Sequence, residues 1–310
     1  MATLVNDLGF NPASSTSVFL LLLVYTFAVT TIIWVIGLFQ GNHSMMDGYY
    51  GFGYAIPVLL AYAIVSPHSA TAAVLVVMAT LHGCRLGWYL AARWRRYVPA
   101  HGGDPRYLNF VTEMSPGYWW KSFFRVMEPQ AVIIVLIGSP AVVGVLENRH
   151  ADGPLGWLAF VGIVVFGIGL YFESLADGQL QAFLALEPRP RYLNTGVWKR
   201  TRHPNYFGTS TVWWGIWLVA VSANSHVWWT VAGPLINTIM LTSVLGSKFQ
   251  DNYMGHRPEY QKLMARTRRF LPWPPLSPEK IAANELKIAA GRQNGAAAAA
   301  SRDEPVATTR

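Results

Sequence analysis

A basic stretch that ends in a proline is the first candidate for chemistry in this sequence. It reads Lys-Arg-Thr-Arg-His-Pro-Asn-Tyr-Phe-Gly over residues 199–208. Proline is favoured at the first position of a helix because it lacks an N–H that the helix would leave unpaired. Arg200, Arg202 and His203 are therefore expected at a helix N-terminus, where free N–H groups and the helix dipole favour anions. This stretch alone is equally compatible with a phosphate-binding corner and with a cationic anchor beside a transmembrane helix.

Two carboxylates one helical turn apart form the second candidate. Glu173 and Asp177 share one face of a predicted helix, and Gln181 follows on the same face. Carboxylates near the end of a membrane span are costly unless they face a cavity or a partner, so we favour a functional role. A ribose hydroxyl, an amide or an arginine could hold one of them. The alternative is that both cap the span at the depth of the headgroups.

A third candidate is the stripe formed by His82, Arg85 and Tyr89 on another predicted helix. His82 is a candidate proton donor, with a structural histidine as the alternative. Arg85 stays charged, so it must face a polar interior or reach the interface. Asp47 lies in a short polar link before a helix, and a helix N-cap is the favoured interpretation of an isolated aspartate there.

Several common site motifs are absent from the sequence. No Gly-x-Gly-x-x-Gly or Walker motif is present, and no His/Glu or Cys pair has the spacing of a zinc site, so no metal is expected. The single cysteine, Cys84, excludes an intrachain disulfide. A bound nucleotide would therefore have to be held by helices and the loops between them.

The composition is typical of an integral membrane protein. Hydrophobic residues make up 52% of the chain and charged residues only 13%, against about 25% in soluble domains. The thirteen tryptophans suit interfacial belts, and the net charge of +8 is spread over loops and does not indicate nucleic-acid binding. The N-terminus lacks the pattern of a cleaved signal peptide, so its first apolar run is interpreted as a retained helix. A bacterial plasma membrane is the default expectation for its location.

The predicted fold is all-α, a bundle of about seven transmembrane helices over residues 1–275. The expected spans are 18–39, 50–65, 70–92, 130–146, 155–176, 205–223 and 227–246. Seven spans place every strongly basic segment on one side, with the N-terminus outside and the C-terminus in the cytoplasm. An interfacial helix is expected around the aromatic residues at 118–125 and a basic amphipathic helix over 247–270. Residues 276–310 are expected to form a disordered, Ala-rich tail.

The motifs of the C-terminal half resemble the steroid 5α-reductase superfamily, and most closely its bacterial branch of uncharacterised membrane proteins. The resemblance rests on Phe-Glu-Ser-Leu-Ala-Asp-Gly-Gln-Leu at 172–180, Asn-Thr-Gly-Val-Trp at 194–198, the stretch at 201–208, Trp-Trp-Gly at 213–215 and Arg-Pro-Glu-Tyr at 257–260. It is clear over about 170–273 and looser towards the N-terminus.

The resemblance implies a bundle that holds NADPH and transfers hydride to the β-carbon of a conjugated alkene in a lipid-like substrate. By position, Glu173 and Asp177 would help to seat the nucleotide. Residues lining its phosphates and nicotinamide would be Arg191, Tyr192, Arg202, His203, Asn205 and Tyr206. The catalytic candidates are His82, where the steroid enzymes have a tyrosine that contacts the substrate carbonyl, and Asp47, roughly where they have a catalytic glutamate.

Two departures from the family pattern keep other functions open. Thr209 follows Gly208 where the family usually has a glutamate, and His82 replaces the substrate tyrosine. One alternative is a membrane S-adenosylmethionine-dependent methyltransferase of the isoprenylcysteine or phospholipid type, which shares the Arg-His-Pro motif. Such enzymes typically carry a Glu-Glu pair after the last span, where this chain has Phe-Gln-Asp-Asn at 249–252. The other alternative is a non-catalytic lipid-binding relative.

Overall fold

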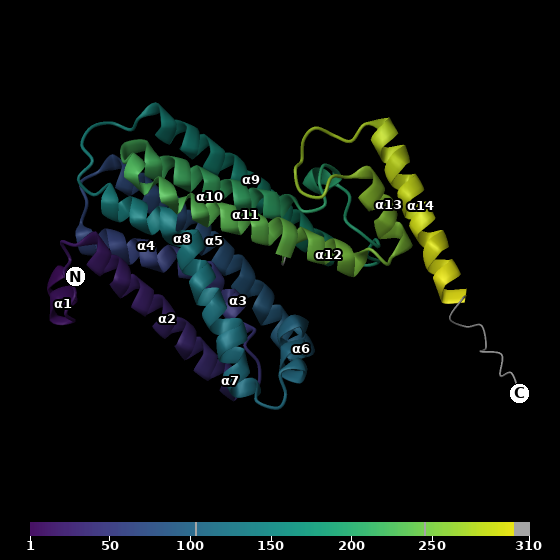
Figure 1. The fold of residues 1–310 in the computed structure, drawn as a ribbon, viewed down its shortest axis with the longest axis horizontal. Coiled ribbons are helices and arrows are strands. Elements are labelled where there is room, and N and C mark those ends of the chain that lie inside the picture. The colour runs from purple at the N-terminus through teal and green to yellow at the C-terminus, as the bar shows by residue number, and fades with distance from the viewer. Residues whose placement is uncertain (103, 245, 301–310) are drawn as a thin grey trace, which may run out of the picture. The chain divides into compact units, whose positions relative to one another are not determined.

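The computed structural model describes residues 1–102, 104–244 and 246–300, and over these residues the protein is helical without strands. This confirms the predicted all-α class. The helices, in chain order, are α1 (Ala2–Asp7), α2 (Ser15–Gln40), α3 (Met45–Tyr50), α4 (Phe52–Val65), α5 (Ala70–His101), α6 (Pro105–Glu113), α7 (Tyr118–Ser122), η1 (Phe123–Met127), α8 (Glu128–Glu147), α9 (Trp157–Leu184), η2 (Gly196–Lys199), α10 (Pro204–Ala223), η3 (Ser225–Val231), α11 (Ala232–Ile239), η4 (Met240–Val244), α12 (Ser247–Met254), α13 (Pro258–Arg266) and α14 (Pro278–Ala300) (Figure 1).

The helices belong to two compact units. The first unit comprises residues 1–170 and 210–238, and the second comprises residues 171–209 and the chain from residue 239 onwards. Helices α9 and α10 each contribute one part to the first unit and one part to the second. All the predicted cofactor residues belong to the second unit, whereas His82 and Asp47 belong to the first.

Six helical segments of the described chain are long and apolar enough to cross a membrane, which identifies a multi-pass membrane protein. They are Ser15–Gln40, Met45–Val65, Ala70–Arg96, Tyr118–Glu147, Trp157–Leu184 and Ser225–Met254. The sixth predicted span, 205–223, forms the helix α10 but is not among the six candidates in the described chain. Its tryptophans, glycines, serines and threonines make α10 less apolar than an aliphatic span. The orientation of the termini stays a prediction.

The aromatic residues predicted to form a separate interfacial helix are instead continuous with a membrane-spanning helix. Helix α7 and the π-helical turn η1 run directly into α8, so that one helical segment covers Tyr118–Glu147. Pro129 lies in the first turn of α8, where a missing N–H is tolerated. The π turn accommodates the change in hydrogen bonding at this junction.

The core of the first unit is built by α2, α4, α5 and α8, in which α4 and α8 contact each other and both contact α2 and α5 (Figure 1). Small residues permit the close approach of α3 and α4 to α5. Gly51 lies between α3 and α4, and a Cβ added there would lie 2.1 Å from the backbone nitrogen of Gly87 and 2.6 Å from the carbonyl oxygen of Gly83. The backbones of the two segments are therefore in direct contact, and only glycine fits at this position.

The variant Gly51→Ala is expected to destabilise the protein by roughly 1–3 kcal/mol, because the added methyl group overlaps backbone atoms that cannot rotate away. The matched control is Gly167→Ala, since a Cβ at Gly167 would have no atom within 4 Å. Thermal unfolding of both variants in the same detergent checks this. Equal melting temperatures for the two variants would contradict the close backbone contact.

The link between α2 and α3 is polar and buried. The side chains of Asn42, His43 and Ser44 are at most 7% exposed. The imidazole Nδ1 of His43 is hydrogen-bonded to the hydroxyl of Tyr118, and the indole of Trp94 donates to the hydroxyl of Ser44 at 3.1 Å. Burial lowers the pKa of His43 from 6.5 to about 4, so the imidazole is neutral at physiological pH.

Acidification is therefore expected to weaken the fold through His43. Its pKa is lower in the folded than in the unfolded chain, so the unfolded chain binds the proton first, and stability is lost as the pH falls from 6.5 towards 4. Between pH 7.5 and pH 5 the loss is about 2 kcal/mol. Thermal unfolding across this pH range checks it, with His43→Gln expected to flatten the pH dependence. A variant with the wild-type pH profile would show that another group is responsible.

The second unit contains α12, α13 and α14 with the adjoining parts of α9 and α10. The basic amphipathic helix predicted over 247–270 forms as two helices, α12 and α13, because Pro258 begins a new helix after Gly255. Helix α13 packs against α14, and Asn284 of α14 donates to the carbonyl of Ala265 at 3.1 Å.

The segment for which a disordered tail was predicted contains the helix α14, from Pro278 to Ala300. Alanine has the highest helix propensity of all residues, so an Ala-rich segment can be helical without an apolar stripe of its own. Residues 301–310 of the predicted tail lie outside the described residues.

Candidate functional site

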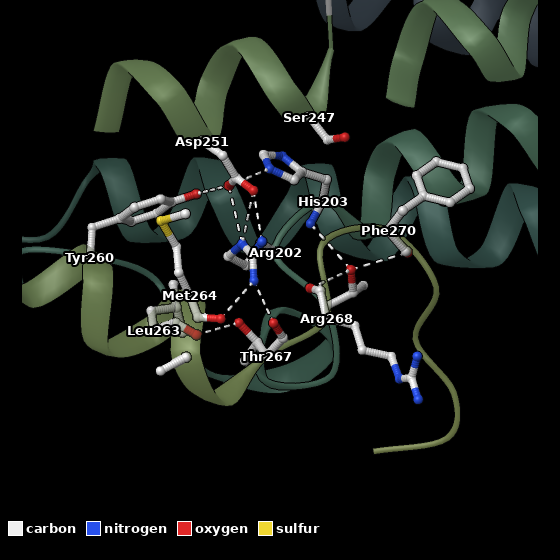
Figure 2. Close-up of polar contacts among 12 residues, drawn as sticks. Arg202, His203, Ser247, Asp251, Tyr260, Leu263, Met264, Thr267, Arg268 and Phe270 are labelled. Carbon is white, nitrogen blue, oxygen red and sulfur yellow. Dashed lines mark hydrogen bonds and ion pairs between the residues drawn. The ribbon is translucent and has the colours of Figure 1, made fainter. Parts of the chain in front are cut away.

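The Arg-His-Pro stretch begins helix α10 at Pro204, as predicted, but its arginine is directed at protein acceptors. The guanidinium of Arg202 is 8% exposed, and its Nε donates to both carboxylate oxygens of Asp251 at 3.1 and 3.2 Å. Its Nη2 donates to Asp251 Oδ2 at 2.7 Å. Its Nη1 donates to the carbonyl oxygens of Met264, at 3.2 Å, and of Thr267 (Figure 2). All three guanidinium nitrogens are thus bound within the second unit.

Asp251 of α12 is the centre of this buried network. Its Oδ1 accepts a hydrogen bond from the hydroxyl of Tyr260 at 2.8 Å and lies 3.1 Å from His203 Nε2 (Figure 2). The carboxylate is 5% exposed. Burial and the negative charge of Asp251 raise the pKa of Tyr260, so the phenol remains a donor. One carboxylate of α12 therefore binds three side chains from two other segments of the chain, Arg202 and His203 before α10 and Tyr260 in α13.

Backbone contacts fasten the same stretch to the segment that follows α13. Thr201 and Arg268 form an isolated parallel bridge, with Arg202 N donating to the Arg268 carbonyl at 3.0 Å. The hydroxyl of Thr201 donates to the carbonyl of Phe270 at 3.0 Å. We call Arg202, His203, Asp251 and Tyr260, with these backbone contacts, the Asp251 network. A phosphate bound by Arg202 would have to displace a buried carboxylate and two carbonyl groups.

The predicted acidic pair is buried, and each carboxylate accepts a hydrogen bond from a neutral side chain. Glu173 is 1% exposed and accepts a hydrogen bond from the hydroxyl of Thr209 at 2.8 Å. Asp177 is 4% exposed and accepts one from the side-chain amide of Asn205 at 3.3 Å. Both carboxylates are therefore shielded from solvent by protein rather than exposed at the end of the helix.

Thr209, which stands where the steroid 5α-reductase superfamily usually has a glutamate, has a clear structural role. Its hydroxyl contacts Glu173 at 2.8 Å and the carbonyl of Asn205 at 3.0 Å. A glutamate at this position would set a second carboxylate beside the first, and two such groups share a proton because both cannot easily be ionised. With threonine, Glu173 has an O–H donor in place of a competing carboxylate.

A loop closes over the same part of α9. The backbone N–H of Val197 donates to the side-chain oxygen of Gln179 at 3.0 Å, and the indole of Trp198 donates to the Ala176 carbonyl at 3.1 Å. Gly196 has φ +56, and a Cβ there would lie 2.3 Å from the Gln179 side chain. The Asn-Thr-Gly-Val-Trp motif is therefore shaped to contact the helix that carries the acidic pair.

The other predicted cofactor residues have different environments. The rings of His203 and Tyr206 are stacked, with centroids 5.4 Å apart and an interplanar angle of 5°. Arg191 is exposed and forms a surface ion pair with Glu259. Tyr192 is half-buried in the loop before η2.

His82, in the first unit, lies in an aromatic enclosure within a candidate span. It is 0% exposed on α5. Its imidazole stacks on the ring of Tyr54 at 6.5 Å and meets the indole of Trp213 edge-on at 5.7 Å. Arg85 and Tyr89, the other two residues of the predicted stripe, are also neighbours on α5. The guanidinium carbon of Arg85 lies 6.0 Å from the Tyr89 ring centroid.

The interpretation of Asp47 as an N-cap is wrong. Ser44 is the N-cap residue of α3, and Asp47 lies in the first turn of that helix. Its carboxylate accepts a hydrogen bond from the Tyr107 hydroxyl at 2.9 Å and lies 3.6 Å from Arg93 Nη2. Arg93 also pairs with the buried Asp104 at 2.9 Å. The prediction fails because tertiary contacts determine the partners of Asp47. The guanidinium of Arg93 and the phenol of Tyr107 bind its carboxylate in place of backbone N–H groups.

The structure separates the two predicted catalytic residues. Asp47 contacts Arg93, which lies eleven positions beyond His82 on α5. Eleven residues correspond to about 16 Å along a helix axis. His82 therefore belongs to an aromatic cluster, and Asp47 belongs to an ionic cluster around Arg93. The two clusters lie at different heights along α5.

Sequence reasoning missed Asp251, a buried carboxylate with three side-chain partners in the second unit. Asp251 stands in a basic segment and has no acidic neighbour at helical spacing, so only its isolation distinguished it. Its partners Arg202 and His203 lie 49 and 48 positions earlier in the chain. No local rule links residues across such a distance.

Comparison with known proteins places the chain in a family. The relative Uncharacterized protein C594.04c of Schizosaccharomyces pombe is 23% identical over 300 residues, which cover 83% of this chain and 80% of the relative. No solved structure matches the chain. The family model described as protein of unknown function (DUF1295) matches residues 33–267, so the chain that carries the Asp251 network and the buried acidic pair is a member of the DUF1295 family.

Proposed function

We propose that this protein is a membrane-embedded reductase that uses NADPH to reduce a conjugated C=C bond in a lipid-like substrate. The observation that carries the proposal is the pair of buried carboxylates on α9, bound by the hydroxyl of Thr209 and the amide of Asn205. Carboxylates that accept from neutral O–H and N–H donors suit ribose hydroxyls and a carboxamide. The motifs shared with the steroid 5α-reductase superfamily lie around the same residues.

The donor set of the second unit fits a dinucleotide. Glu173 and Asp177 would accept from its hydroxyl or amide groups. Arg191 would bind a phosphate, because its present partner Glu259 is on the surface and exposed ion pairs contribute little. The stacked rings of His203 and Tyr206 would line the site beside Asn205. Bound NADPH supplies the hydride for the reduction.

Arg202 has a structural role in this proposal rather than the phosphate-binding role that the resemblance implies. Its nitrogens are bound to Asp251 and to two carbonyl groups, so it holds the start of α10 rather than a phosphate. The helix start is thereby fixed in the position from which Asn205 and Thr209 reach the acidic pair.

His82 is the proposed proton donor to the carbonyl oxygen of the substrate. An imidazole enclosed by Tyr54 and Trp213 in an apolar bundle can bind a carbonyl without competition from bulk water. The surrounding apolar helices favour a lipid-like substrate. Asp47 is assigned a supporting role, since its carboxylate pairs with Arg93 and Tyr107.

The two alternative functions remain as outcomes of the test. The Arg-His-Pro motif is shared with membrane methyltransferases, but here Asp251, near the end of the last candidate span, is bound by Arg202, His203 and Tyr260. The Asp251 carboxylate therefore has less hydrogen-bonding capacity left to bind S-adenosylmethionine. A non-catalytic lipid-binding relative is favoured by Thr209, which removes a charge that the superfamily usually has.

Isotope transfer tests the proposal directly. Membranes containing the protein are incubated with a lipid extract and NADPH carrying deuterium at the transferred position, and the lipids are analysed by mass spectrometry. We expect products that gain one deuterium from NADPH and one proton from water, and we expect His82→Phe to lose them. The control His226→Phe changes an exposed histidine and is expected to remain active. Methylated products with S-adenosylmethionine, or no product above the His82→Phe background, would overturn the proposal.

A further inference from the structure

We propose that the second unit carries a binding surface for the headgroups of anionic phospholipids, separate from the reductase site. The surface consists of Lys199, Arg200, Arg268, Arg269 and Trp273, and we call it the cationic face. Its residues come from two segments, one before α10 and one after α13. None of the five belongs to the proposed cofactor site.

The Asp251 network holds the two segments of the cationic face together. Arg200 and Arg269 flank the bridge between Thr201 and Arg268, so the two arginines lie on neighbouring backbone segments. The Arg268 side chain extends away from Asp251 (Figure 2) and donates from Nε to the carbonyl of Pro274. The guanidinium carbon of Arg200 lies 5.8 Å from the ring centroid of Trp273. The cations and the indole are therefore gathered by the fold as well as by the sequence.

The charge of the cationic face is not neutralised within the described part of the chain. There, Lys199, Arg200, Arg268 and Arg269 form no ion pair with a carboxylate, whereas Arg191 pairs with Glu259 and Arg266 with Glu285. The reason is visible in the sequence, because neither 188–203 nor 260–278 contains an acidic residue. Four uncompensated cations on one surface attract a multiply negative partner.

The apolar side chains beside these cations favour a membrane over a soluble anion. Trp273 is 72% exposed and Leu271 is 52% exposed. An indole is favoured at headgroup depth, and exposed leucine gains free energy by entering the acyl boundary. The segment also follows the last candidate span, Ser225–Met254, within twenty residues. Basic clusters next to a span bind acidic lipids at about 1 kcal/mol per cation.

Lipid binding by the full-length protein in neutral detergent tests the cationic face. The probes are fluorescent phosphatidylglycerol and phosphatidylcholine, followed by anisotropy. We expect phosphatidylglycerol to bind more tightly, and the double variant Lys199→Gln with Arg200→Gln to weaken its binding by about tenfold or more. The matched control is Lys280→Gln with Lys287→Gln, which removes the same charge from exposed positions of α14 and is expected to bind as wild type.

Two further arms separate a lipid site from a phosphate site and from general charge attraction. Trp273→Ala keeps every charge and is expected to weaken phosphatidylglycerol binding, whereas glycerol 3-phosphate at millimolar concentration is expected not to displace the lipid. Equal binding of the two lipids, equal losses in the two double variants, or displacement by glycerol 3-phosphate would each overturn the proposal. Failure here leaves the reductase test unaffected, because the two surfaces share no residue.

Discussion

Replacing Asp251 with alanine is expected to destabilise the second unit by about 3–5 kcal/mol, the usual cost of removing one partner of a buried ion pair. The guanidinium of Arg202 would remain buried at 8% exposure without its counter-ion. His203 and Tyr260 would lose their acceptor at the same time. Since the network joins α10, α12 and α13, the segment 255–275 is expected to become sensitive to protease.

Thermal unfolding and limited proteolysis in detergent check this result. The control is Glu259→Ala, which removes a surface ion pair with Arg191 and is expected to cost less than about 1 kcal/mol. The double variant Arg202→Met with Asp251→Leu is expected to recover part of the loss, because two apolar groups need no counter-ion. Equal losses in the Asp251 and Glu259 variants would contradict the structural role of the network.

The second large effect is expected at the acidic pair. Asp177→Ala should weaken NADPH binding by about tenfold or more, because a hydrogen bond to a charged group contributes about 1.5–3 kcal/mol. Asp177 is 4% exposed and is bound to Asn205 at 3.3 Å, so its oxygens are positioned before any ligand arrives. The control Glu187→Ala removes an exposed acid from the neighbouring loop and is expected to leave the affinity unchanged.

Arg202→Ala gives the informative comparison for this prediction. The variant is expected to lower the melting temperature, since Arg202 binds Asp251 and two carbonyl groups. Measured well below that temperature, its loss of NADPH affinity should be smaller than that of Asp177→Ala. A direct phosphate contact by Arg202 would reverse this order, and unchanged binding in the Asp177 variant would remove the acidic pair from the cofactor site.

Features of the site that depend only on residues close together in the sequence could be predicted from it. Pro204 marked the start of α10 because its fixed φ and missing N–H suit that position only. The spacing of Glu173 and Asp177 placed both on one helical face, and the structure buries both against one segment. The long apolar runs likewise identified all six candidate membrane spans of the described chain, although the predicted span at 205–223 is not among them.

The features that the sequence did not reveal depend on contacts between distant residues. Asp251 meets Arg202 across 49 positions, and neither residue shows this in its local pattern. The local pattern predicts Asp47 as a helix N-cap. Its partners Arg93 and Tyr107 are distant in the sequence and approach it only in the folded chain. The charge of Arg202 predicts an anion site or a membrane anchor, whereas tertiary packing directs its guanidinium to Asp251 and two carbonyl groups.

The most direct test of the account is a titration of the purified protein in detergent with NADPH, NADH and S-adenosylmethionine, read as the shift in melting temperature. Ligands that bind the folded state raise the melting temperature in proportion to the logarithm of their concentration over Kd. We expect stabilisation by NADPH that is strongly reduced in Asp177→Ala and retained in Glu187→Ala. Stabilisation by S-adenosylmethionine without NADPH, or by none of the three ligands, would contradict it.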